Sequence, residues 1–213
     1  MNKPLAYLFD AYGTLFDVHS VVTEELQELS RVWRRKQLES TWLLALMERY
    51  RDFWEVTELA LRSAARELSI DLTESRVDAL MKGYLAPAAF PEVQSALDAL
   101  TGSPLGILSN GSPVMLTAAV RAHSLESYFA HLISVDRVRT YKPSPRVYAL
   151  GTEALKLPAE DVLFVSSNWW DVAGAKTFGY RVCWCNRSGA EMEAWGAAPD
   201  YVVARLDLVP GLA

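Results

Sequence analysis

The sequence predicts an α/β fold with a parallel sheet that is covered by helices on both faces and interrupted by a helical insertion. Apolar strand-like runs alternate with helical segments over most of the 213 residues. Continuous apolar strands of this kind are typical of parallel sheets, which are buried on both faces. The predicted strands are Leu5–Phe9, Leu105–Leu108, Leu132–Val135, Val162–Val165 and Tyr180–Trp184.

The helices between these strands have recognisable ends. Ser112 and Pro113 mark the start of one helix, because serine caps a helix N-terminus and proline suits its first turn. A second predicted helix covers Pro143–Leu155. A third covers Trp170–Phe178 and ends at Gly179, since glycine commonly terminates helices.

The alternation stops between about residues 18 and 90, where no strand-like run occurs. Apolar side chains in this stretch follow helical spacing, and the aromatic-rich run Trp42–Trp54 predicts one helix. We interpret the stretch as a helical cap that is inserted after the first strand. The expected division is a core domain of residues 1–17 and 91–213 and a cap subdomain of residues 18–90.

The composition excludes several classes of protein. Hydrophobic residues make up 51% of the chain and charged residues only 22%, which argues against disorder. The net charge of -5 gives no electrostatic footprint for nucleic acid. No apolar run approaches the roughly 20 residues that span a bilayer. We expect a cytoplasmic protein that binds neither nucleic acid nor a membrane.

Cysteine and histidine residues give little support for a metal site. Cys183 and Cys185 alternate along a predicted strand, so they share a face and are poorly placed to bridge each other. We interpret them as small apolar residues. The three histidines are scattered, and none has a cysteine or histidine at metal-ligand spacing. A zinc site or a histidine-based triad is therefore not expected.

Polar side chains follow the ends of the predicted strands. Any one of them has an ordinary explanation, since a strand-end aspartate is often a turn former and a lysine is often a surface residue. In a parallel sheet, however, ligands bind outside the carboxyl ends of the strands, so these groups are expected to converge on one cleft. The residues are Asp10, Tyr12, Thr14, Ser109, Asn110, Lys142, Tyr148, Ser166, Ser167, Asn168 and Asp171.

These segments resemble the four motifs of the haloacid dehalogenase superfamily, and most closely its 2-haloacid dehalogenase branch. The matching stretches are "FDAYGTLFDVHSV", "ILSNGSP", "YKPSPRVYALG" and "LFVSSNWWDVAGAKTFGYRVCW", together with "WRRKQLESTWL" in the cap. The resemblance spans nearly the whole chain and implies a Rossmann-like core with an inserted cap. The chain departs from the usual pattern at Arg35 and Ser40, where the branch commonly has glutamine and tyrosine.

Two residues distinguish the chain from the magnesium-dependent phosphatases of this superfamily. Those enzymes carry a second aspartate two positions after the first, as the general acid, and a pair of acids in the fourth motif that hold magnesium. Here Tyr12 and Ser167 stand at such positions. Halide leaves as an anion and needs no proton, so these losses suit cleavage of a carbon–halogen bond. A magnesium-dependent phosphatase and a non-catalytic binding protein are the alternatives.

The resemblance implies a role for each matching polar residue. Asp10 is the nucleophile that expels halide and forms an ester, and Asp171 orients or activates the water that hydrolyses it. Lys142 keeps neighbouring carboxylates ionised and in place. The remaining members of the implied catalytic set support the hydrolytic water or surround the nucleophile; they are Thr14, Asn168, Ser166 and Tyr148.

The resemblance also implies how a 2-haloalkanoic acid is bound, without a metal or other cofactor. Ser109 contacts the substrate carboxylate, and Arg34 with Asn110 cradles the halide ion. Tyr12, Leu38, Phe53 and Trp170 form an apolar wall, although ordinary core packing is the alternative for Leu38 and Phe53. The family is commonly homodimeric, and the predicted helix Trp42–Trp54 is a candidate interface.

Overall fold

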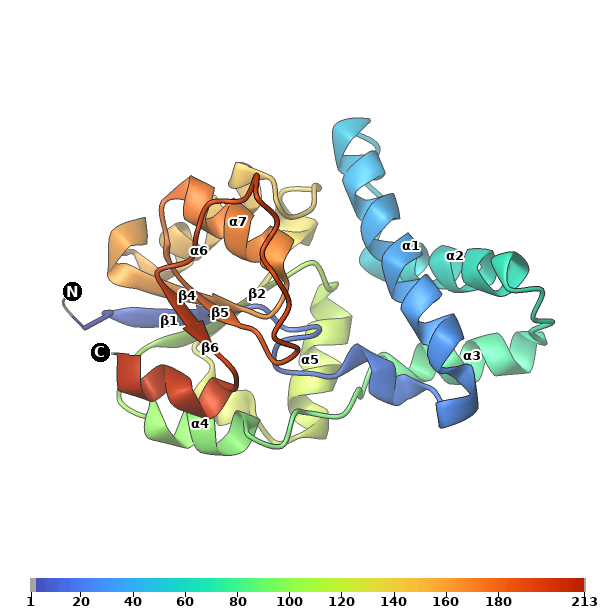
Figure 1. Ribbon diagram of the computed structural model, residues 1–213, viewed down its shortest axis with the longest axis horizontal. Helices are drawn as coiled ribbons and strands as arrows, with labels where there is room; N and C mark the ends of the chain where they lie inside the picture. Colours follow the sequence, from blue (N-terminus) through green and yellow to red (C-terminus); the bar gives the residue numbers. More distant parts are fainter. Residues whose placement is uncertain (1–2, 213) are drawn as a thin grey trace.

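The computed structural model describes residues 3–212. Within them, six parallel strands form one sheet in the order β3-β2-β1-β4-β5-β6 (Figure 1). The α/β fold with a parallel sheet is therefore confirmed. The strands are β1 (Ala6–Phe9), β2 (Leu105–Ser109), β3 (His131–Ser134), β4 (Val162–Ser166), β5 (Arg181–Cys185) and β6 (Tyr201–Val203).

Strand β1 lies at the centre of the sheet, and all of its residues are buried. It pairs with β2 and with β4, and Phe9 lies opposite both Ile107 and Val165. This register aligns the carboxyl ends of three neighbouring strands. Asp10, Asn110 and Ser167 therefore emerge from the same edge of the sheet, which is where parallel sheets bind ligands.

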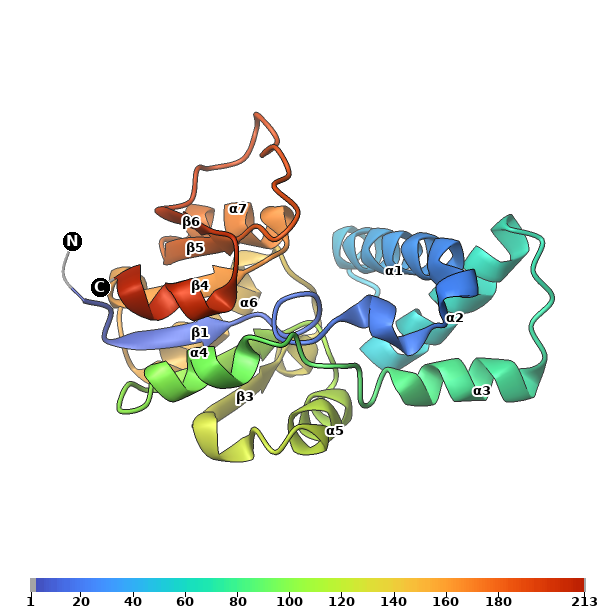
Figure 2. The same cartoon turned by 60° about the horizontal axis from the view of Figure 1, so that its bottom comes forward.

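Helices cover both faces of the sheet, as the alternating pattern predicts. Figures 1 and 2 show α4 (Val93–Ala99) and α5 (Pro113–Ala122) on one face and α6 (Pro145–Leu155) and α7 (Trp169–Phe178) on the other. The predicted ends are confirmed for α5, which Ser112 caps through the backbone N–H of Met115, and for α7, which ends at Gly179.

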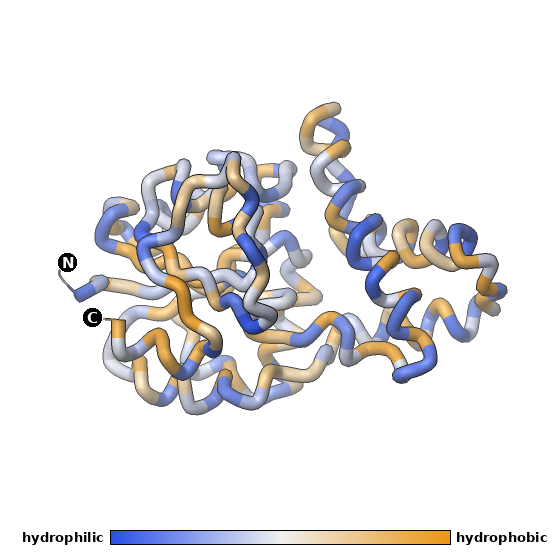
Figure 3. The backbone as a smooth tube through the Cα atoms, viewed as in Figure 1, coloured by the Kyte–Doolittle hydropathy of each residue, from blue (hydrophilic) through white to orange (hydrophobic). Residues whose placement is uncertain are grey.

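Three further helices lie together beyond the carboxyl ends of the strands (Figures 1 and 2): α1 (Gln27–Leu46), α2 (Phe53–Glu67) and α3 (Glu74–Gly83). Hydrophobic and hydrophilic residues alternate along α1 and α2 (Figure 3), as expected for helices that bury one face. The indole Nε1 of Trp33 in α1 donates to the carbonyl oxygen of Thr57 in α2 over 2.7 Å, which ties these two helices together.

The prediction of one helix over Trp42–Trp54 is wrong. Helix α1 ends at Leu46, which is 81% exposed, and Glu48 adopts a left-handed φ of 55° that interrupts the helix. A new helix begins at Phe53, because the side chain of Asp52 accepts hydrogen bonds from the first backbone N–H groups of α2. The apolar residues from Trp42 to Trp54 thus keep helical spacing by chance, although Asp52 starts a new helix and separates α2 from α1.

Two smaller differences concern short elements. Strand β6 has only three residues and was not predicted, because its apolar run is shorter than those of the predicted strands. Helix α6 begins at Pro145, after Ser144, and not at Pro143. The remaining elements are 3-10 turns at Val18–Val21, Glu24–Leu26, Glu126–Tyr128, Val135–Arg137, Ala159–Asp161 and Leu206–Leu212. Within residues 3–212, the helices are all too short or too polar to cross a bilayer.

Candidate active site

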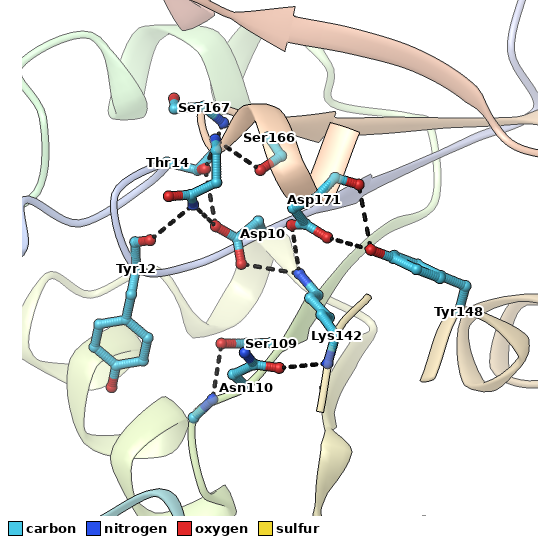
Figure 4. A network of polar contacts seen from close by, with 12 residues as sticks. Asp10, Tyr12, Thr14, Ser109, Asn110, Lys142, Tyr148, Ser166, Ser167 and Asp171 are labelled. Atoms are coloured by element: carbon cyan, nitrogen blue, oxygen red, sulfur yellow. Dashed lines mark hydrogen bonds and ion pairs between the residues drawn. The ribbon is translucent and has the colours of Figure 1, made fainter. Parts of the chain in front are cut away.

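The polar groups predicted to converge do meet at the carboxyl edge of the sheet (Figure 4). The centre of this site is the ammonium group of Lys142. Its Nζ lies 2.9 Å from Asp10 Oδ1 and 2.8 Å from Asp171 Oδ2, and the lysine side chain is 0% exposed. Two buried carboxylates thus share one buried cation, and the three groups together carry one net negative charge.

Burial controls the protonation of this cluster. Together with the charge of Asp10, it raises the pKa of Asp171 to about 6, despite the opposing contacts from Lys142 and Tyr148. Burial alone lowers the pKa of Lys142, but the two carboxylates outweigh it and the net pKa lies above the ordinary lysine value. The lysine is therefore charged at neutral pH, and Asp171 accepts a proton when the pH falls below about 6.

The second oxygen of Asp10 is held by two neutral donors. Thr14 Oγ1 donates to Oδ2 over 3.0 Å, and Asn168 Nδ2 donates to the same oxygen over 2.9 Å. Both donors are themselves fixed, because Ser167 N donates to Thr14 Oγ1 over 2.9 Å and Asn168 N donates to Ser166 Oγ over 3.1 Å. Donors on both carboxylate oxygens set the orientation of Asp10 before any ligand binds.

Tyr148 contacts Asp171 and not Asp10, which the resemblance implied as its neighbour. Its hydroxyl donates to Asp171 Oδ1 over 2.8 Å, and it makes no hydrogen bond to Asp10 among the described residues. Asp171 therefore receives Lys142 on one oxygen and Tyr148 on the other. Both contacts favour the ionised carboxylate and partly offset the cost of burying it.

Ser109, at the end of β2, and Asn110, directly after it, lie at the backbone end of Lys142 and not at its ammonium end (Figure 4). Ser109 Oγ accepts a hydrogen bond from Gly111 N over 3.1 Å. Asn110 Oδ1 accepts from the backbone N–H of Lys142 over 3.1 Å, which fixes the amide plane. No described residue accepts from Asn110 Nδ2, so this amide group keeps its donors for a ligand.

Arg34, in α1, is a second positively charged residue near the site, and it contacts the loop after β1. Its Nη2 donates to the backbone carbonyl of Tyr12 over 3.2 Å, and the same carbonyl accepts from Asn168 Nδ2 over 3.3 Å. Gln37, one helical turn along α1, accepts from Arg34 Nη1 over 2.7 Å and donates to Thr57 Oγ1 over 2.7 Å. The guanidinium is thus fixed beside the loop that follows Asp10.

Aromatic rings separate this polar cluster from solvent. The buried ring of Tyr12 lies 6.2 Å from that of Phe53 and 6.1 Å from that of Tyr84, measured between centroids. Within residues 3–212, the Tyr12 hydroxyl is buried with no hydrogen-bond partner. Burial raises its pKa above the ordinary tyrosine value, so it stays protonated. Trp170 in α7 packs edge-on against Trp42 of α1 at 5.6 Å.

A cleft of about 1270 Å³ lies between α1 and the carboxyl edge of the sheet. Arg34, Leu38 and Trp42 line it from α1, and Asn168 and Trp170 line it from the core. The structure therefore brings Arg34, Leu38 and Trp170 to one opening that reaches a direct partner of Asp10. Tyr12 and Phe53, by contrast, are both buried and are not part of the lining.

The position between the two carboxylates is occupied by the ammonium group of Lys142. A divalent cation between Asp10 and Asp171 would displace the Lys142 ammonium, which binds both carboxylates. Magnesium also requires a near-octahedral shell of oxygen ligands. Among the described residues, no three His, Cys, Asp or Glu side chains are grouped so that they could hold a metal.

Two residues that shape the site were not predicted from the sequence. Gln37 orients Arg34, and its position three residues later on the same helix is a signal that could have identified it. Arg187, after β5, contacts the loop that carries Thr14. No local pattern marks it, since its partners are far away in sequence. Arg35, where the chain departs from the common pattern, lines the cleft together with its ion-pair partner Glu67.

Fold and site together define an α/β enzyme class that places a buried aspartate at the carboxyl edge of a parallel sheet, next to the helices α1, α2 and α3. Comparison with known proteins identifies the family. Residues 5–179 match the haloacid dehalogenase-like hydrolases. The chain belongs to this family.

Similar proteins have been characterised. The chain is 48% identical over 210 residues to the (S)-2-haloacid dehalogenase of Pseudomonas sp. (strain YL), which covers 94% of this chain and 90% of that protein. It is 45% identical over 218 residues to haloacetate dehalogenase H-2 of Moraxella sp. (strain B), with 98% and 97% covered. The L-2-haloacid dehalogenase from Xanthobacter autotrophicus, solved with chloropropionic acid covalently bound, superposes with a TM-score of 0.92 at 38% identity, over 98% of each chain.

Replacing Lys142 tests the electrostatic description of the site. In Lys142→Met two buried carboxylates lose their shared cation, so we expect the free energy of unfolding at pH 7 to fall by about 3–5 kcal/mol. Lys176→Met is the matched control, because Lys176 binds Asp200 in a partly exposed ion pair that contributes about 1 kcal/mol or less. Urea denaturation measures both. Equal losses in the two variants would contradict the description.

Proposed function

We propose that this protein hydrolyses short-chain L-2-haloacids, the (S) enantiomers, to D-2-hydroxy acids with inversion at the α-carbon. The names of its relatives support this assignment, since the similar proteins are a haloacetate dehalogenase and (S)-2-haloacid dehalogenases. The observation that carries the proposal is the environment of Asp10. It is a carboxylate held for attack by Lys142, with the tyrosine Tyr12 where a phosphatase would need an acid.

In the first step Asp10 attacks the α-carbon from the side opposite the halogen. A carbon–oxygen bond forms, the carbon–halogen bond breaks, and halide leaves with its electron pair, so no proton donor is required. Ser109 and neighbouring backbone N–H groups hold the substrate carboxylate. Arg34 and the unpaired donors of Asn110 receive the halide, because guanidinium is a weakly hydrated cation suited to a large anion. The covalently bound chloropropionic acid in the similar Xanthobacter enzyme supports an intermediate of this kind.

In the second step water attacks the carbonyl carbon of the Asp10 ester. Asp171 takes the proton of this water, with Asn168 and Ser166 holding the surrounding groups in place. The bond between the carbonyl carbon and the ester oxygen breaks, and the leaving oxygen takes the proton back from Asp171 to become the hydroxyl group of the 2-hydroxy acid. The Asp10 carboxyl group loses the remaining proton of the water to solvent, which regenerates the carboxylate. The new oxygen stays on Asp10, and Lys142 stabilises the ionised products of both steps.

The helical segment 18–90 acts in this proposal as a cap over the core of residues 1–17 and 91–213. Leu38 and Trp170 line the cleft and provide apolar surface around the substrate. Tyr12 completes this wall in the proposal, with Phe53 packed against its ring. Excluding water protects the displacement step, since Asp10 is a better nucleophile when it is poorly hydrated. Water then enters for the second step.

We also propose that the protein is a cytoplasmic homodimer. Cys183 and Cys185 are buried and not paired in a disulfide, which suits a reducing compartment. The end of α1 exposes Leu43, Leu46 and Met47, an apolar surface that a second copy could cover. Sedimentation equilibrium measures the mass directly, and a monomer at micromolar concentration would contradict the dimer.

Halide release tests the proposed function. With the two enantiomers of 2-chloropropionate and excess EDTA, we expect the wild type to release chloride from the L enantiomer only and to form the D-hydroxy acid. Asp10→Ala is expected to release no chloride, because the nucleophile is absent. No release by the wild type, together with magnesium-dependent cleavage of a phosphate ester, would refute the proposal in favour of a phosphatase.

The dependence of kcat on pH tests the role of Asp171. Because burial raises its pKa to about 6, the rate should fall as the pH drops below this value and the base becomes protonated. Tyr148→Phe removes a hydrogen bond to the ionised form. Such a bond contributes about 1.5 kcal/mol, which is about one pKa unit, so the variant should be about sixfold slower than wild type near pH 6, about tenfold slower near pH 5 and close to it at pH 8.

A matched control separates this effect from general loss of a buried tyrosine hydroxyl. Tyr180→Phe removes a hydroxyl that donates to the backbone carbonyl of Tyr148 over 2.7 Å and touches neither carboxylate. Its profile should keep the wild-type shape. Parallel profiles for Tyr148→Phe and the wild type would show that another group controls the acidic limb.

A further inference from the structure

Arg187, just beyond strand β5, reaches back to the loop that follows strand β1. Its Nη2 donates to the backbone carbonyl of Thr14 over 2.9 Å, and its Nη1 donates to that of Gly13 over 3.3 Å and to Ser167 Oγ over 2.8 Å. Its Nε donates to a carboxylate oxygen of Glu92 over 2.9 Å. One guanidinium thus joins three segments that are distant in sequence.

These contacts bracket the residue that orients the nucleophile. The two carbonyl acceptors belong to the peptide groups on either side of Thr14, whose hydroxyl donates to Asp10 Oδ2. The turn depends on Gly13, which has a φ of 93° that side-chain-bearing residues rarely adopt. Fixing both peptide planes fixes the direction of the Thr14 hydroxyl and so one oxygen of Asp10.

The same guanidinium also contacts the point where the chain returns from the cap. It lies 3.7 Å from the centroid of the Phe90 ring, and Phe90 N donates to the carbonyl of Leu15 over 3.0 Å. Glu92, its ion-pair partner, is buried. Arg187 therefore holds the nucleophile loop and the second connection to the cap as one unit.

Only arginine suits this arrangement. Its planar fork carries five N–H donors, whereas lysine presents a single ammonium on a flexible stem. Removing the fork would leave the Gly13 and Thr14 carbonyls without these donors, and the Glu92 carboxylate buried without its cation, and each such loss is costly. Arg187 makes no hydrogen bond to Asp10, so its effect on this carboxylate passes through Thr14 and Ser167. The guanidinium also lines the cleft, and direct binding of substrate would show as a change in KM.

We propose that Arg187 is a positioning residue for the displacement step, which it supports by locking the peptide groups around Thr14 and thereby the attacking carboxylate of Asp10. This inference rests on the proposed dehalogenation, because its readout is halide release. It differs from a purely structural role, in which loss of the guanidinium would lower stability but leave each folded molecule as fast as before.

The test compares Arg187→Met and Arg187→Lys with the control Arg62→Met. Arg62 makes ion pairs with Glu58 and Glu74 on the cap surface and touches no residue of the site. The rate of the first chloride burst with L-2-chloropropionate is measured well below each melting temperature. Arg187→Met should be about 10²-fold slower with KM changed less than about threefold, since a small misplacement of reacting groups has effects of this size.

The conservative variant sharpens the test. Arg187→Lys keeps the charge and one or two of the contacts, so its burst rate should lie between those of Arg187→Met and the wild type. Burst rates for both Arg187 variants equal to that of Arg62→Met would overturn the inference, even if their melting temperatures fall. If Arg187→Met does not fold, the burst rate of Arg187→Lys is compared with that of Glu92→Gln instead. Glu92→Gln should be less stable than wild type but nearly as fast, whereas Arg187→Lys should be slower.

Failure of the proposed function gives a different result. If the proposed function is wrong, the wild type and Arg62→Met would release no chloride at all. The proposed role of Arg187 would then be refuted together with the proposed function. A normal burst in these two proteins and an unchanged burst in the Arg187 variants refutes only the role of Arg187.

Discussion

The buried ammonium of Lys142 is the constraint on which the rest of the site depends. It binds Asp10 and Asp171 at 2.9 and 2.8 Å in a region closed to solvent. Bringing two carboxylates together away from water is unfavourable unless a cation and further hydrogen bonds compensate. The lysine supplies the cation. Because it lies at the carboxyl edge of the sheet, it reaches both Asp10, directly after β1, and Asp171, in the helix that follows β4.

The surrounding residues meet the remaining needs of the two carboxylates. Thr14 and Asn168 hold the second oxygen of Asp10, and Tyr148 holds that of Asp171. These neutral donors orient the two carboxylates and leave their negative charge in place, whereas a metal ion would neutralise it. An ionised Asp10 can act as a nucleophile, and a buried Asp171 with a raised pKa can accept a proton near neutral pH.

Much of this arrangement is predictable from the sequence because it follows strand ends. Asp10 and Ser109 end or follow apolar runs, and parallel register brings such ends together regardless of distance along the chain. The break between α1 and α2 was not predictable from periodicity, since Asp52 decides it through capping. Arg187 was invisible for another reason: all of its partners come from other segments, and no spacing rule reports such contacts.

The most direct test of the account follows the oxygen of water in a single turnover. Excess enzyme is mixed with L-2-chloropropionate in ¹⁸O-labelled water, and both the product and the peptide that contains Asp10 are analysed by mass spectrometry. The account predicts unlabelled oxygen in the new hydroxyl group of the product and ¹⁸O in the Asp10 carboxylate. Label in the product with an unlabelled Asp10 would mean that water attacks the substrate directly, and would contradict the ester intermediate.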